Sequence, residues 1–194
     1  VTVSLSTALL GGIDYIEWHF YSGYCVLGLL LFRLLSGFLS ADLSHFNYFN
    51  FSISAIRDYL SGKKQFMGHN PLGSWVVVVF LIVLLLQAFS GLLTTDDFFA
   101  EGPWVFWAED SWVSLASTIH AWNYQIILAL IALHIGAALV YQFVLKTGLI
   151  VAMITGRKIV GEVEVAASSM SVLRFVAMAI TAALITYALL NLEL

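Results

Sequence analysis

The sequence predicts an all-α protein, a bundle of transmembrane helices. Of its 194 residues, 61% are hydrophobic and only 10% are charged, whereas a soluble domain carries about 25% charged residues. Several continuous apolar runs reach the length of about 20 residues that a helix needs to cross a bilayer. Runs of this kind, without the ten-residue alternation of membrane strands, favour helices over a β-barrel.

We interpret residues 1–194 as a single transmembrane domain with five spans, the first of them partial. The first span covers only about half a crossing, because ten helical residues rise roughly 15 Å. We therefore expect it to be the second half of a helix whose first half precedes Val1. The predicted spans cover about residues 1–11, 15–38, 74–93, 115–145 and 171–190, with a short interfacial helix at 54–60.

The distribution of basic residues predicts how these spans are oriented. Segments 39–70 and 146–170 hold six of the eight Lys and Arg residues, and segments 12–18 and 94–114 hold none. By the positive-inside rule, the first two segments are cytoplasmic and the second two lie outside. Segment 94–114 also carries five acidic residues and three tryptophans, which predicts an acidic loop with an aromatic membrane-interface belt.

Two histidines share one face of the span at 115–145. His120 and His134 are fourteen residues apart, which places them on one stripe of the helix and roughly 21 Å apart along its axis. A histidine within the hydrocarbon region is costly and usually functional. His19 lies on another span that runs in the same direction, at the depth of His120. Two imidazoles from different helices at one depth are a natural pair of axial ligands for a haem iron.

His134 needs a second ligand near the inner surface. His69 lies too close to that surface, by about 10 Å on the helical rise. We therefore expect the partner on the missing half of the first helix, one to two turns before Val1. A lone histidine in a membrane protein is more often a hydrogen-bonded packing residue, and this is our interpretation of His45 and His69.

Other residues near these faces suit a cofactor. Arg33 follows His19 by fourteen residues, so it shares the His19 face and the depth of His134. A buried arginine needs an anion such as a haem propionate or a lipid phosphate, and the alternative is that Arg33 snorkels to the cytoplasmic surface. Small residues would let a flat porphyrin approach the backbone, namely Gly23, Gly28, Gly136 and Ala137. Gln87 and Ser90 are interpreted as hydrogen-bonding a neighbouring helix.

Several motifs together resemble the bacterial di-haem membrane cytochrome b family, over residues from about 15 to 160. This family supplies membrane subunits of nickel–iron hydrogenases and formate dehydrogenases, and also stand-alone cytochromes. The resemblance is carried by Trp18-His19 with the following run to Arg33, Gly68-His69-Asn70-Pro71-Leu72-Gly73, Gln87-Ala-Phe-Ser-Gly91-Leu, His120-x13-His134 and Met153-Ile-Thr-Gly156-Arg157-Lys158.

The resemblance implies two b haems in a four-helix core, of which the first helix is only partly present, and a fifth, C-terminal helix outside that core. By position, His19 and His120 would be ligands of the outer haem and His134 a ligand of the inner haem, whose other ligand falls before Val1. His69 would contact a propionate or cap its helix.

The expected function is electron transfer in the bacterial inner membrane, as a subunit of an oxidoreductase complex. Loops 39–70 and 146–170 would be cytoplasmic and loop 94–114 periplasmic. The expected partners are a periplasmic redox protein, such as a c-type cytochrome or a hydrogenase-like subunit, a quinone or second carrier, and the lipid bilayer, but no nucleic acid. The alternatives are a self-contained quinone reductase or superoxide oxidase, and a haem-free transporter or structural subunit.

Overall fold

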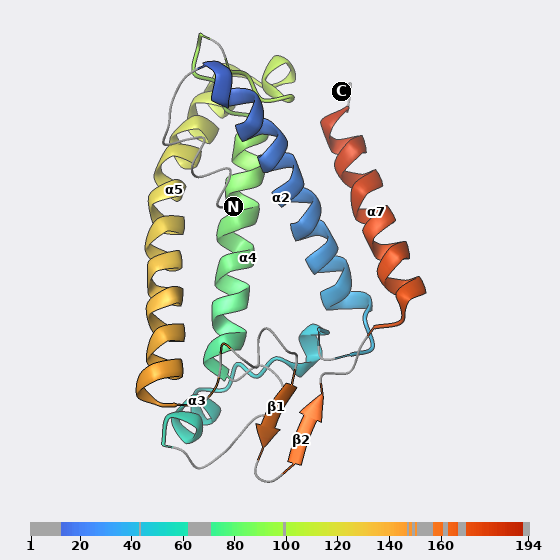
Figure 1. Cartoon of the computed structure of the whole chain (residues 1–194). Helices are drawn as coiled ribbons and strands as arrows, with labels where there is room; N and C mark the ends of the chain where they lie inside the picture. The colour runs from blue at the N-terminus through green and yellow to red at the C-terminus, as the bar shows by residue number, and fades with distance from the viewer. Residues whose placement is uncertain are drawn as a thin grey trace.

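Four long helices form the body of the protein (Figure 1). The computed structural model describes residues 13–42, 44–61, 71–98, 100–146, 148, 150, 157–160, 163–166 and 170–191. All four helices are long and apolar enough to cross a membrane, which confirms the predicted fold class. The partial span at 1–11 lies outside the described residues. The four helices are α2 (Ile13–Leu39), α4 (Pro71–Leu92), α5 (Asp110–Leu139) and α7 (Val172–Leu190).

Successive long helices alternate in direction, so α2 and α5 run the same way through the bundle (Figure 1). The most extensive packing joins α4 to α5 and α2 to α7, and α2 also packs on α4. On the α2–α7 contact, the rings of Phe32 and Phe175 have centroids 5.2 Å apart. A Cβ added at Gly28 would lie 3.3 Å from the Thr186 hydroxyl. Gly28 therefore faces α7, and its predicted place beside a porphyrin was wrong.

The ends of the long helices follow from their sequences. Proline lacks the backbone N–H that the first helical position leaves unpaired, and Pro71 is the first residue of α4. The Ser171 hydroxyl accepts a hydrogen bond from the Arg174 amide and caps α7. Helix α5 begins at Asp110, whose carboxylate suits the positive end of a helix. It continues at its other end into a π-helical turn, η3 (Val140–Val144).

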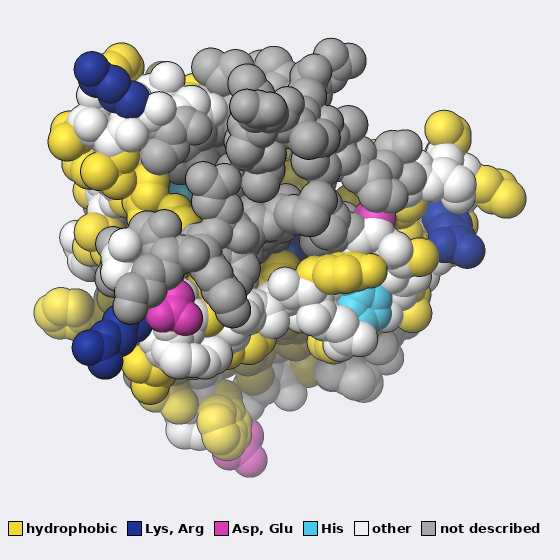
Figure 2. Space-filling model, turned by 90° about the horizontal axis from the view of Figure 1, so that it is seen from below, with side chains coloured by type: hydrophobic (Ala, Val, Ile, Leu, Met, Phe, Trp, Pro, Cys, Tyr) yellow, Lys and Arg dark blue, Asp and Glu magenta, His cyan; other side chains and the backbone are white. Residues whose placement is uncertain are grey.

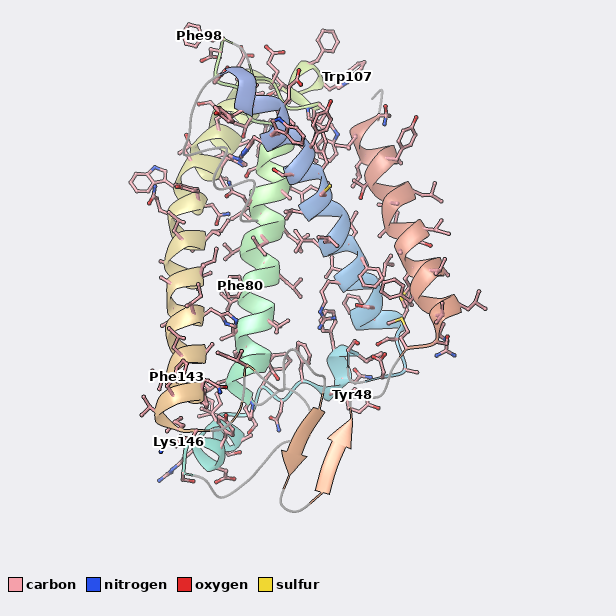
Figure 3. All side chains as sticks on the ribbon, in the orientation of Figure 1. Tyr48, Phe80, Phe98, Trp107, Phe143 and Lys146 are labelled. Carbon is pink, nitrogen blue, oxygen red and sulfur yellow. The ribbon has the colours of Figure 1, made fainter. Side chains whose placement is uncertain are left out.

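A structured loop covers the end of the bundle where α2 and α5 begin. A bridge pairs Thr95 with Glu101, and η2 (Val105–Trp107) follows it. The Trp104 indole donates a hydrogen bond to the Leu189 carbonyl at 2.7 Å, which ties this loop to α7. In Figure 3 the labelled Phe98 and Trp107 stand at this end of the molecule. We call it the loop-95 end.

The opposite end carries three short elements: η1 (Phe46–Tyr48), α3 (Ile53–Leu60) and the antiparallel pair β1 (Arg157–Val160) and β2 (Val163–Ala166). The predicted short helix is present as α3, and stacked Tyr59 and Tyr141 rings, 6.3 Å apart, join it to the end of α5. The strand pair was not predicted. Figure 2 views this end and shows Lys and Arg side chains around its margin.

Candidate functional site

His19 and His120 meet at the loop-95 end of the bundle. Their ring centroids are 6.1 Å apart, and the ring planes are nearly perpendicular at 83°. Both side chains are half-buried. The two residues come from helices that run in the same direction, so the depth argument from the sequence correctly brought them together.

The geometry of the pair fits two ligands of one metal. Imidazoles that bind a metal from opposite sides have centroids roughly 6 Å apart, because each metal–nitrogen bond is about 2.0–2.1 Å and each ring radius adds about 1.2 Å. Within the described ranges, no group of three or more His, Cys, Asp or Glu residues could hold an ion. A porphyrin supplies four ligands itself and needs only axial partners from the protein. The residues present therefore fit haem better than a bare metal ion.

Helix α4 determines which nitrogen of His120 is available. His120 Nδ1 lies 3.0 Å from the Gln87 carbonyl and 3.2 Å from the Ser90 hydroxyl. A carbonyl oxygen can only accept, so the short contact places the hydrogen on Nδ1. The neutral ring then carries its lone pair on Nε2, the nitrogen that can bind a metal. Metal-binding histidines commonly donate their other N–H to a backbone carbonyl in this way.

Gly91 provides the space that the His120 ring occupies. A Cβ added at Gly91 would lie 2.9 Å from His120 Cε1 and 3.3 Å from Nδ1. Atoms do not approach a Cβ so closely, so any side chain at Gly91 would push the imidazole away from α4. The contact explains why a glycine stands at this point of the Gln87–Leu92 motif.

Two hydrogen-bonded side-chain amides, those of Gln87 and Asn123, lie next to His120. The sequence analysis singled out only Gln87. The Gln87 side chain donates to the His120 carbonyl at 3.1 Å, and the Asn123 amide donates to Gln87 Oε1 at 2.8 Å. Gln87 was predicted to bond a neighbouring helix, but Asn123 was not singled out. The available signal was its spacing, because Asn123 lies one helical turn beyond His120.

His134 lies farther along α5. Its ring packs edge-on against Phe80 of α4, with centroids 5.6 Å apart, and the labelled Phe80 in Figure 3 marks this level between the two helices. Its predicted partner lies upstream of Val1, so the pairing remains a prediction.

His69 lies outside the described residues. His45 is a local cap, whose Nδ1 accepts from the Asn47 amide at 3.0 Å.

The two predicted glycines differ in their surroundings. Among the residues that the structure describes, none would lie within 4 Å of a Cβ added at Gly23 or Gly136. Gly23 follows His19 by one turn of α2, so this open space adjoins the histidine pair. Gly136 follows His134 by two residues, about 200° around the helix, which places it on the far side of α5. Both cofactor contacts remain predictions, and the geometry supports Gly23 better.

Arg33 lies at the other end of α2 and contacts a loop. Its guanidinium donates to the Ser44 carbonyl at 3.1 Å and stands 4.8 Å from the centre of the Phe46 ring. Asp42 is close by, and hydrogen bonds from the Ser44 side chain and backbone lower the pKa of its carboxyl. The structure therefore gives Arg33 protein partners, while its contact with a propionate or phosphate remains untested.

We expect Arg33→Met to lower the stability of the protein. The methionine keeps the apolar stem but loses the charged hydrogen bond and the cation–π contact, which together contribute about 1–3 kcal/mol. The thermal unfolding temperature in detergent should fall. Arg174→Met removes a charge from an exposed position on α7 and is the matched control. Equal unfolding temperatures for the two variants would contradict the anchoring role, and a changed haem spectrum at unchanged stability would favour the propionate contact.

Comparison with known families gives one match. The model of a family described as prokaryotic cytochrome b561 matches residues 2–156, which include both members of the histidine pair, the Gln87–Leu92 motif and His134. No curated protein and no solved structure gave a match.

Proposed function

The chain belongs to the prokaryotic cytochrome b561 family, and on this premise we propose that His19 and His120 bind a haem b through which the protein transfers electrons. Family membership makes it a multi-pass membrane cytochrome of b type. When bound, haem b supplies a one-electron iron couple whose potential depends on its axial ligands and surroundings. The observation that carries the assignment is the 6.1 Å separation of the two imidazoles.

The chain's own residues give the proposed site its properties. The Gln87 carbonyl keeps the hydrogen on Nδ1 of His120, so Nε2 would be the nitrogen free to bind the haem iron. Gly91 seats the ring against α4. The open space at Gly23, one turn from His19, leaves room for a flat ring system. Apolar side chains of the surrounding helices would limit the access of water to the haem, which is one of the influences on its reduction potential.

We propose a second haem at His134 and carriers at the two ends of the bundle. Fourteen helical residues place His134 roughly 21 Å from His120, so the two centres would span much of the bilayer. Five exposed carboxylates crowd the loop-95 end: Asp96, Asp97, Glu101, Glu109 and Asp110. Their charge favours a redox protein with a basic face. The cytochrome would lie in the bacterial inner membrane. Its redox protein partner would be periplasmic, and its second carrier would be a quinone.

An absorption spectrum of the purified, dithionite-reduced protein tests this function. We expect the α-band of a b-type haem, and a haem assay should give two haems per chain if His134 also binds one. One haem per chain would remove the second site and leave the first. A colourless protein expressed with sufficient haem would overturn the proposal.

A further inference from the structure

A chain of three hydrogen bonds runs between α4 and α5 and ends on the His120 carbonyl. Asn123 donates from Nδ2 to the Val83 carbonyl at 2.9 Å and to Gln87 Oε1 at 2.8 Å, and Gln87 Nε2 donates to the His120 carbonyl at 3.1 Å. Asn123 is only 3% exposed. We call Gln87 and Asn123 the amide lock.

The amide lock has only one possible direction. The Val83 and His120 carbonyls at its two ends can only accept, so each must face an NH₂ group. Turning either amide over would bring two acceptors together and leave buried donors unpaired, at a cost of about 1–3 kcal/mol per group. The two side chains are therefore held in one orientation by the backbone of both helices.

Gln87 holds His120 at two points. Its side chain binds the His120 carbonyl, and its own carbonyl accepts from Nδ1 of the same residue at 3.0 Å. Ser90, one turn farther along α4, adds a second contact to Nδ1 at 3.2 Å. The side-chain bond holds the backbone of α5 against α4 at His120 itself, beside the contact between the imidazole and the Gln87 carbonyl. The amide bond is therefore placed to support the ring hydrogen bond.

We propose that Gln87 and Asn123 are positioning residues that adjust the electron-donating strength of His120. A hydrogen bond from Nδ1 to a carbonyl increases the basicity of the imidazole as a ligand. A more basic axial ligand stabilises the oxidised iron and lowers the reduction potential, which is one of the means by which a protein controls haem. The amide lock would thus give this haem a lower reduction potential than it would have if Gln87 and Asn123 did not support His120. This inference rests on the proposed role of His120 as a haem ligand.

Redox titration of single variants tests the amide lock. Gln87→Leu and Asn123→Leu keep most of the side-chain volume and remove the bonds. Both should retain haem while the midpoint potential rises, with about a tenfold change in the oxidised-to-reduced ratio, or about 59 mV for one electron. The ferric electron paramagnetic resonance signal should also shift, because it reports the orientation of the imidazole plane.

Gln125→Leu is the matched control. It removes the same amide from an exposed position on α5, two residues from Asn123, and should leave the potential and the signal unchanged. Gln87→Glu keeps the length of the side chain, and in its protonated form it can both accept from Asn123 and donate to the His120 carbonyl; at a pH where this form is present it should retain most of the wild-type potential.

The outcomes separate this inference from the function on which it rests. Wild-type potential and signal in both leucine variants, or an equal shift in Gln125→Leu, would overturn the amide lock and leave a haem ligand at His120. If the leucine variants do not accumulate, Gln87→Met should still raise the potential, because it keeps the length of the side chain and removes both of its amide bonds, and its failure to do so would overturn the inference. Absence of a b haem from the wild-type protein would instead overturn the proposed function.

Discussion

Replacing His120 with alanine should remove the haem that we propose between α2 and α5. His120 would supply one of the two axial nitrogen donors, and the variant would leave only His19 to hold the group. The b-type α-band of the purified protein should fall by the contribution of one haem. His120→Gly should recover that absorbance when imidazole is added in solution, because the vacated space accepts the free ring.

His45→Ala is the control for this experiment. His45 caps a short loop helix at the other end of the bundle, so its removal should leave the haem content at the wild-type level. Unchanged haem content in His120→Ala would refute the assignment of His120. Loss of haem in both variants would show a general failure of folding.

Gly91→Leu should weaken haem binding at the same site while leaving both histidines in the sequence. The added side chain would occupy the place of the His120 ring, whose Cε1 lies 2.9 Å from the position of a Cβ. Overpacking of this kind costs about 1–3 kcal/mol, which corresponds to roughly a 5- to 150-fold loss of haem affinity. Haem titration of the purified apoprotein measures this loss.

Gly91→Ala should show a smaller loss, since the ring needs to move by only a few tenths of an ångström. Ala183→Leu adds the same bulk at an exposed position on α7 and should bind haem normally. Wild-type affinity in Gly91→Leu would mean that the imidazole does not lie against α4 when haem is bound.

The fold and the histidine pair could be predicted because both depend on simple periodic quantities. Apolar length defines the four long helices, and the distribution of basic residues gives the direction of each. His19 and His120 then come together because each lies at a similar depth in the membrane, on one of two helices that run in the same direction. The haem-binding role of the pair remains a prediction, as do the roles of His134, His69 and the two glycines.

The surroundings of the pair could not be predicted, because they depend on how helices rotate against each other. Gln87 and Asn123 are thirty-six residues apart, and hydropathy does not show that their amides face one another. Arg33 was expected to meet an anion or to snorkel to the surface, and hydropathy did not show its contact with a loop only eleven residues farther on. The β1–β2 pair had a visible signal in β2, where Val163 and Val165 alternate with glutamates, but this was not used.

The packing of the four helices groups them in two pairs. The amide lock joins α4 to α5, and α7 packs along α2. His19 and His120 therefore belong to different pairs, which also touch through α2 and α4. A ligand that binds only the joined state stabilises it in proportion to the logarithm of its concentration. Haem bound by both histidines would therefore link the two pairs, and its addition should raise the unfolding temperature of the protein.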